Sequence, residues 1–108
     1  MKNKAKYKQV HYVYKLRIFV KGAVLYKLGF SRCVERRVGF LLKPGVTIEI
    51  VSTAQFDTMA KALSVEQYLI SKNKGIKYVG RNILPSGNTE LFISEPDTFR
   101  YNFIPYIL

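Results

Sequence analysis

Four polar residues of this 108-residue chain are of types that together could cleave a phosphodiester. They are Tyr14, Lys27, Arg37 and Glu66. Hydrolysis of a phosphodiester spreads charge over the phosphoryl oxygens, so its catalysis depends mostly on positioning and charge stabilisation. A tyrosine, two cations and one carboxylate suit that reaction with a single metal ion. The fold would have to bring these four side chains together.

Tyr14 and Lys27 fall on two segments that the sequence predicts to be the strands of a β-hairpin. Residues 10–20 are rich in β-branched and aromatic side chains, and apolar and polar residues alternate along them, which is typical of a strand. Residues 21–22 (Lys-Gly) give a turn, and residues 23–29 return as the second strand.

Arg37 falls on a predicted helix over residues 32–42. Ser31 is the expected N-cap, and a Lys-Pro-Gly sequence at residues 43–45 ends the helix. Apolar residues recur at helical spacing and leave Arg36 and Arg37 near the edge of the buried face.

Glu66 falls on a second predicted helix, over residues 59–72, which Asp57 or Thr58 would cap. Its position borders the apolar stripe of this helix rather than pointing fully away from it. A carboxylate at the edge of a core needs a partner, which is usually a cation.

The remaining segments complete an α+β arrangement. Residues 46–52 alternate as a third strand, residues 73–89 are basic and loop-like, and residues 89–94 read as a short final strand. We therefore expect a small three-stranded antiparallel sheet flanked by helices.

A chain of this length is expected to fold as one domain. Residues 10–94 would form it. Residues 1–9, with lysine at every second position, read as a basic N-terminal arm. Residues 95–108 are an apolar extension that would pack on the domain or contribute to an interface.

The net charge of +11 predicts a polyanionic partner. Nucleic acid is favoured, because aromatic residues make up 14% of the chain and could stack on bases while lysine and arginine hold phosphates. The best candidates for these phosphate contacts are Arg36, Lys72, Lys74, Lys77 and Arg81. A ribosomal or anionic-membrane partner, or a charge that serves only solubility, is compatible with charge alone.

Several other chemistries are disfavoured. With one cysteine and one histidine, the chain has no internal disulfide, no Cys/His zinc site and no Ser-His or Cys-His nucleophile pair. No apolar run suits a signal peptide or approaches the ~20 residues of a membrane span, so we expect an intracellular, cytoplasmic protein with no membrane partner.

The order and spacing of the four residues resemble those of the GIY-YIG nuclease superfamily. Residues 12–14 (Tyr-Val-Tyr) resemble the end of its first motif, with Tyr14 as the motif tyrosine. Residues 27–29 (Lys-Leu-Gly) are similar to the Lys-Ile-Gly form of the second motif in a phage and fungal branch. Tyr12 stands where glycine is usual, and Lys27 stands where many members have tyrosine.

The later family motifs also have counterparts, so that the resemblance covers about residues 10–94. Arg37 follows Lys27 by ten positions, as the arginine of the family's first helix does. Residues 66–72 resemble the family's glutamate segment, and residues 87–92 resemble a Gly-x-x-Glu-aromatic-Phe ending. We expect Glu90 to close the sheet and face a lysine or arginine.

The resemblance implies a metal-dependent endonuclease that acts on DNA, with RNA not excluded. Glu66 would hold one Mg²⁺ or Mn²⁺, and Arg37 would brace the scissile phosphate. Tyr14 would orient or deprotonate the attacking water, and Lys27 would share that task or add positive charge. A homodimer or a targeting partner protein could supply specificity, and a phage protein acting in the host cytoplasm fits this expectation.

Two other functions are open at this stage. The same fold with a lapsed active site could bind nucleic acid or inhibit another enzyme, and a basic α+β protein of the ribosome or a phage particle could carry the motifs by coincidence. Taken singly, Tyr14 would be a packing residue, Arg37 and Lys27 solvated charges, and Glu66 a surface or salt-bridge residue.

Overall fold

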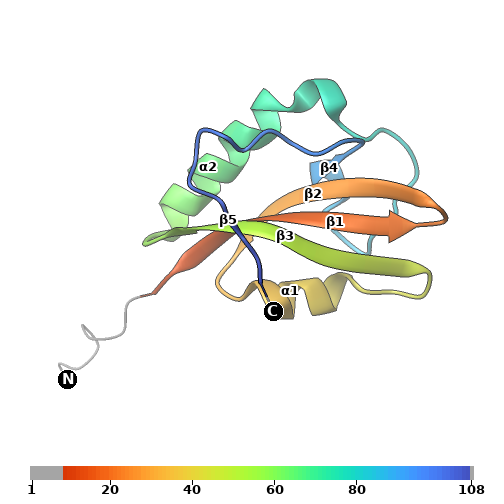
Figure 1. Ribbon diagram of the computed structural model, residues 1–108, viewed down its shortest axis with the longest axis horizontal. Coiled ribbons are helices and arrows are strands. Elements are labelled where there is room, and N and C mark those ends of the chain that lie inside the picture. The colour runs from red at the N-terminus through yellow and green to blue at the C-terminus, as the bar shows by residue number, and fades with distance from the viewer. Residues whose placement is uncertain (1–8, 108) are drawn as a thin grey trace.

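The computed structural model describes residues 9–107, in which an antiparallel sheet has the strand order β4-β2-β1-β3-β5 (Figure 1). The predicted basic arm therefore lies outside the described residues, apart from Gln9. The strands are β1 (His11–Val20), β2 (Ala23–Ser31), β3 (Val46–Phe56), β4 (Leu91–Phe92) and β5 (Ile104–Pro105).

The α+β class is confirmed, but the prediction of a three-stranded sheet is wrong because the sheet has five strands. Its centre, β2-β1-β3, consists of the three predicted long strands. The edge strand β4 lies within the short final strand predicted at residues 89–94, whereas β5, with two residues, is too short for a period-two pattern to be recognised. Pro105 is tolerated in β5 because an edge strand leaves one side without ladder bonds.

The β1–β2 hairpin sets the register of the site. Lys21 and Gly22 both have positive φ angles, 48° and 75°, as a two-residue hairpin turn with the right twist requires. This turn places Tyr14 directly opposite Gly29 and Leu16 opposite Lys27. The side chains of Tyr14 and Leu16 consequently share one face of the sheet.

Helices α1 (Val34–Leu41) and α2 (Met59–Lys72) cover opposite faces of the sheet (Figure 1). Tyr14 and Leu16 pack in a core cluster with α1 residues Val34 and Leu41. A second cluster joins β1 and β2 to α2 and consists of Val13, Leu28, Ala62, Val65, Leu69 and Phe92.

The predicted helix boundaries hold for α2 and shift for α1. Thr58 caps α2, since its Oγ1 accepts a hydrogen bond from the Lys61 backbone N–H at 3.1 Å. Helix α1 begins two residues later than expected, and Ser31 is not its cap. The Ser31 hydroxyl bonds instead to the backbone of Cys33, accepting from its N–H at 3.1 Å and donating to its carbonyl at 3.0 Å.

The C-terminal segment returns across the α2 side of the molecule (Figure 1). Tyr101 and Phe103 pack against the α2 cluster, and β5 pairs with β3 at Ser52 and Thr53. Leu108 lies outside the described residues. Among residues 9–107, no helix is both long enough and apolar enough to cross a membrane.

Candidate active site

Tyr14, Lys27, Arg37 and Glu66 line one pocket of about 280 Å³. They come from β1, β2, α1 and α2, so four elements converge on it. The other lining residues are Gly29, Phe30, Leu63, Gln67 and Glu90. A larger, more apolar groove of about 690 Å³ lies between α1, β3 and the C-terminal segment, but it contains none of the four residues.

Tyr14 is held in the pocket by the absence of a side chain at Gly29. The tyrosine is 1% exposed, and its ring lies over its cross-strand partner. A Cβ built on Gly29 would stand 2.3 Å from the Tyr14 hydroxyl oxygen, which is a severe overlap. Glycine at position 29 therefore makes room for the tyrosine ring. We had assigned no role to Gly29 from the sequence, although the two-residue turn fixes this register.

Lys27 is a buried cation, so the alternative that it is merely a solvated strand lysine is wrong. The residue is only 1% exposed, and its Nζ lies 2.8 Å from Glu90 Oε1. It also donates to the carbonyl oxygens of Gly87 at 3.2 Å and Leu28 at 3.4 Å. All three ammonium protons thus have acceptors within the protein. The predicted pairing of Glu90 with a lysine or arginine is confirmed.

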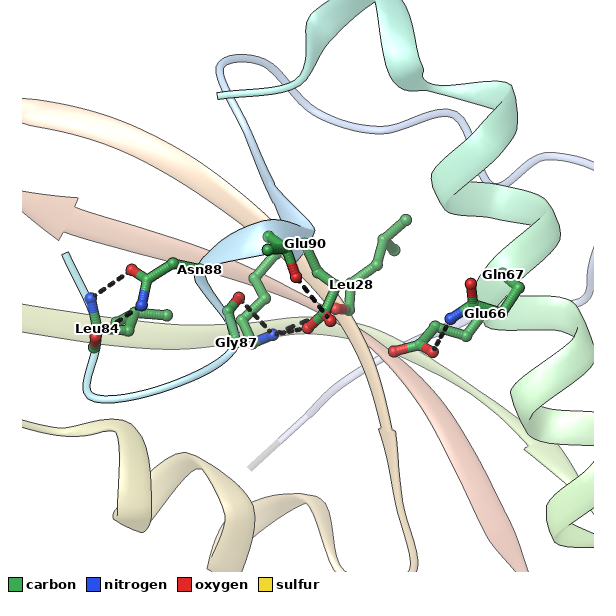
Figure 2. Close-up of polar contacts among 9 residues, drawn as sticks. Leu28, Glu66, Gln67, Leu84, Gly87, Asn88 and Glu90 are labelled. Carbon is green, nitrogen blue, oxygen red and sulfur yellow. Dashed lines mark hydrogen bonds and ion pairs between the residues drawn. The ribbon is translucent and has the colours of Figure 1, made fainter. Parts of the chain in front are cut away.

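The segment that receives Lys27 is shaped around its ammonium group. Gly87 has a φ of 71°, and a Cβ there would lie 2.6 Å from Lys27 Nζ. The neighbouring Asn88 side chain accepts hydrogen bonds from the backbone N–H groups of Ile83 and Leu84 and donates to the Leu84 carbonyl, all within 2.8 Å. Figure 2 shows this chain of contacts, with Glu66 extending from α2 toward Glu90 and Leu28.

Glu66 is a buried carboxylate that forms no ion pair with any described residue. It is 5% exposed, and its Oε1 accepts a hydrogen bond from Gln67 Nε2 at 3.1 Å. Burial raises the pKa of Glu66, and the negative charge of Glu90 raises it further, against the opposing effects of Gln67, Lys27 and Arg37. The alternative that Glu66 is a surface or salt-bridge residue is therefore wrong for the described residues, whereas its expected position at the edge of the apolar stripe agrees with its burial.

Arg37 faces this group of residues from α1. Burial raises the pKa of Tyr14, and the nearby Arg37 guanidinium is the main influence that lowers it again. The guanidinium lies at the exposed side of the pocket, because Arg37 itself is largely accessible to solvent. A guanidinium fork in that position, next to the Tyr14 hydroxyl, suits the oxygens of an entering phosphate.

The five predicted phosphate-contact residues lie outside this pocket. Lys72 forms an ion pair with Asp97 at 3.4 Å, so part of its charge is compensated. Lys74, Lys77 and Arg81 are exposed in the segment that follows α2, and none forms an ion pair within residues 9–107. Arg36 is exposed on α1, next to Arg37.

The donor set fits a hard divalent cation that keeps most of its water. Within the described residues, no three or more histidine, cysteine, aspartate or glutamate side chains gather as a metal cage. Mg²⁺ does not need such a cage, since one or two carboxylates plus substrate phosphate oxygens can hold it. Glu66 is suited to this role, because a buried carboxylate without a cationic partner is stabilised by a bound cation.

No family model, curated protein or solved structure matches this chain. The function is therefore argued from the geometry and chemistry of the pocket.

Proposed function

We propose that this protein is a metal-dependent endonuclease of the GIY-YIG type that hydrolyses phosphodiester bonds in DNA. The observation that carries the proposal is the convergence of Tyr14, Lys27, Arg37 and Glu66 on one pocket. These residues lie up to 52 positions apart in the chain, counted from Tyr14 to Glu66, yet they line the same pocket, which supports the proposal.

The four side chains divide the work as follows. Arg37 binds the non-bridging oxygens of the scissile phosphate and stabilises the charge that develops there. Tyr14 holds the attacking water in line with the phosphorus atom. Since burial raises its pKa, Tyr14 stays a phenol at neutral pH and orients the water instead of removing a full proton in advance.

Glu66 would hold Mg²⁺ or Mn²⁺, which when bound supplies Lewis-acid stabilisation of the phosphate and the leaving oxygen. The Gln67 amide holds one Glu66 oxygen in place and leaves the other to face the pocket. Lys27, bound to Glu90, contributes a fixed cation in the pocket wall. Its fully engaged ammonium leaves Tyr14 as the group that contacts the water.

That engagement of Lys27 also supports a second candidate, a nucleic-acid-binding or inhibitory module of the same fold. A lysine whose three protons are all accepted by the protein cannot take part in proton transfer without breaking these bonds. The pocket would then bind phosphate through Arg37 without cutting it.

Cleavage of supercoiled plasmid separates the two candidates. Wild type is compared with Glu66→Gln and Arg37→Ala in Mg²⁺, in Mn²⁺ and in EDTA. We expect nicking by wild type in either metal, none in EDTA, and at least about a hundredfold loss in both variants, as is typical when one charge-stabilising group is removed.

Two exposed residues outside the pocket supply matched controls. Glu49→Gln and Arg100→Ala remove the same functional groups at distant surface positions and should cut as wild type does. Retardation of DNA without cutting in any divalent metal would support the binding module and contradict the endonuclease. Equal loss in the control variants would contradict the assignment of the site.

A further inference from the structure

Helix α1 packs one face on the sheet and leaves another face exposed to solvent. Successive helical residues are about 100° apart, so Val34, Val38 and Leu41 face the sheet, as their burial shows. Arg36 and Phe40, four residues apart, share the solvent face. No other described segment covers Arg36 and Phe40, so this face is open to a binding partner.

The solvent face inclines toward the candidate active site. Phe40 is about 60° from Arg37 around the helix axis and about 140° from Glu35. Arg37 lines the active-site pocket, whereas Glu35 borders the apolar groove on the other flank and is hydrogen-bonded by the Tyr106 hydroxyl. The one carboxylate of α1 thus lies well away from Phe40 around the helix, whereas Arg36 is about 100° from both Glu35 and Arg37.

The chemistry of this face suits a nucleic-acid strand. Arg36 and Arg32, which precedes α1, line the same pocket of about 500 Å³, and neither forms an ion pair within the described residues. Arg32 also lines a second pocket that contains Glu35. Phe40 is 68% exposed, which is unusual for a phenylalanine. Cations that track a backbone, together with an open aromatic ring, are the elements of single-strand binding sites.

We infer that Arg32, Arg36 and Phe40, here called the α1 outer stripe, bind an unpaired DNA strand next to the scissile phosphate. The arginines contact backbone phosphates, and one unpaired base stacks on the Phe40 ring. This inference rests on the proposed function for the identity of the strand. It makes the substrate a DNA with single-stranded character at or beside the cleavage site.

The basic segment after α2 has cations but lacks an open aromatic ring. Its cations Lys77 and Arg81 flank Tyr78, but the Tyr78 hydroxyl donates to the Arg81 carbonyl at 3.0 Å. The Tyr78 ring also lies over Gly80, where a Cβ would come within 2.6 Å of its hydroxyl oxygen. One face of that ring is thus covered, which makes it a poorer platform for a base.

The other highly exposed phenylalanine has no free pair of cations beside it within the described residues. Phe99 is 93% exposed, and the nearby Asp97 and Glu95 are already paired with lysines. The neighbouring Arg100 is engaged by Tyr68, to whose hydroxyl it donates at 3.1 Å. Phe99 therefore offers a control residue of the same type and greater exposure.

Fluorescence anisotropy with a labelled DNA strand of about 12 nucleotides tests the inference. Measurements in EDTA keep binding separate from cleavage. We expect wild type to prefer the single strand over the same sequence as a duplex. Phe40→Ala should weaken single-strand binding about tenfold, whereas Phe40→Tyr and Phe99→Ala should bind as wild type does.

The arginines are tested through the salt dependence of binding. Arg32→Gln and Arg36→Gln should each reduce the slope of log affinity against log salt by about 0.7, since each removes one phosphate contact to a single strand. Circular dichroism verifies that each exposed substitution leaves the fold intact.

Two outcomes would overturn the inference: equal affinity of Phe40→Ala and wild type, or equal binding of single strand and duplex. Either result could accompany normal nicking, in which case the endonuclease stands and the stripe does not. If the variants lost binding as expected but wild type nicked DNA in no metal, the α1 outer stripe would be supported and the endonuclease would be contradicted.

Discussion

At the residue scale, the candidate site depends on two glycines as much as on its charged groups. Gly29 leaves room for the Tyr14 ring, and Gly87 leaves room for the Lys27 ammonium while its carbonyl accepts a hydrogen bond from it. In both cases the side chain that carries the chemistry occupies space that any Cβ would fill. Single methyl groups should therefore be poorly tolerated at these positions.

Gly29→Ala should destabilise the protein by about 1–3 kcal/mol, the range typical of overpacking in a close-packed core. The alanine Cβ would overlap the Tyr14 hydroxyl, so the ring must leave its position and nicking should fall as well. Urea denaturation and plasmid cleavage measure the two effects. Gly39→Ala is the control, since a Cβ there meets nothing within 4 Å and alanine favours a helix. A Gly29→Ala variant as stable and active as wild type would contradict the role of Gly29.

Glu66→Gln should stabilise the protein at neutral pH. Burial raises the pKa of folded Glu66 above its unfolded value, so the folded state holds this proton more tightly. Wild-type stability therefore decreases as pH rises from the unfolded pKa through the folded pKa, and the deficit persists above it. Glutamine carries no such cost, so its advantage should be present at pH 7 and vanish in acid.

Urea denaturation over a pH series in EDTA measures this difference. The exposed Glu49→Gln variant should gain no stability at pH 7, because Glu49 pairs with Arg17 at the surface. If Glu66→Gln were less stable than wild type at neutral pH, the burial cost assigned to this carboxylate would be wrong.

At the element scale, local signals were sufficient for the long elements and insufficient for the edges. The prediction located β1 and the first part of β3, and α2 has both a capping threonine and an apolar stripe, but β3 continues to Phe56, four residues beyond its predicted end. Strand β4 lies within the final strand predicted at residues 89–94, although only two of those residues pair with β2. Strand β5 was not predicted, because it forms only where tertiary contacts align two residues against β3.

The candidate site divides in the same way. The convergence of Tyr14, Arg37 and Glu66 was expected from the order of the motifs along the chain and from the prediction that two helices pack on a β-hairpin. The sequence predicted that Glu90 would face a lysine or arginine, but it did not identify Lys27 as that residue. Which lysine or arginine it meets depends on how residues 85–92 cross the end of the pocket, and that path is set by Gly87 and the Asn88 hydrogen bonds.

Because Lys27 joins β2 to the segment before β4, removing Glu90 should loosen that connection. Glu90→Ala leaves the buried ammonium uncompensated, and we expect a loss of about 2–3 kcal/mol, below the full cost of breaking a buried pair since Glu90 is partly exposed. Lys27→Met combined with Glu90→Ala should recover much of this stability, because no unpaired charge remains buried. Urea denaturation of the two single variants and the double variant gives their coupling energy. Additive losses would contradict a direct pair.

At the scale of the whole molecule, the net charge of +11 and the single candidate pocket act together. A charge of this size should attract the proposed DNA substrate over a distance set by the Debye length, about 8 Å in physiological salt, so association should weaken steeply as salt rises. Binding of this kind carries no sequence information by itself. Any selectivity must come from contacts beside the pocket, such as the α1 outer stripe.

One pocket of this type per chain also determines the order of cleavage products. A single site can cut one strand at a time, so supercoiled plasmid should first become nicked circles, and linear DNA should follow only after a delay. The delay arises because the second cut, near the first and on the opposite strand, is a separate encounter.

A time course on agarose gels, repeated over a range of protein concentrations, measures both products. If linear DNA appeared together with the first nicked circles and its share rose with protein concentration, two chains would be acting as a dimer. In that case the single-chain cleavage unit argued here would be wrong, although the chemistry assigned to Arg37 and Glu66 could still hold.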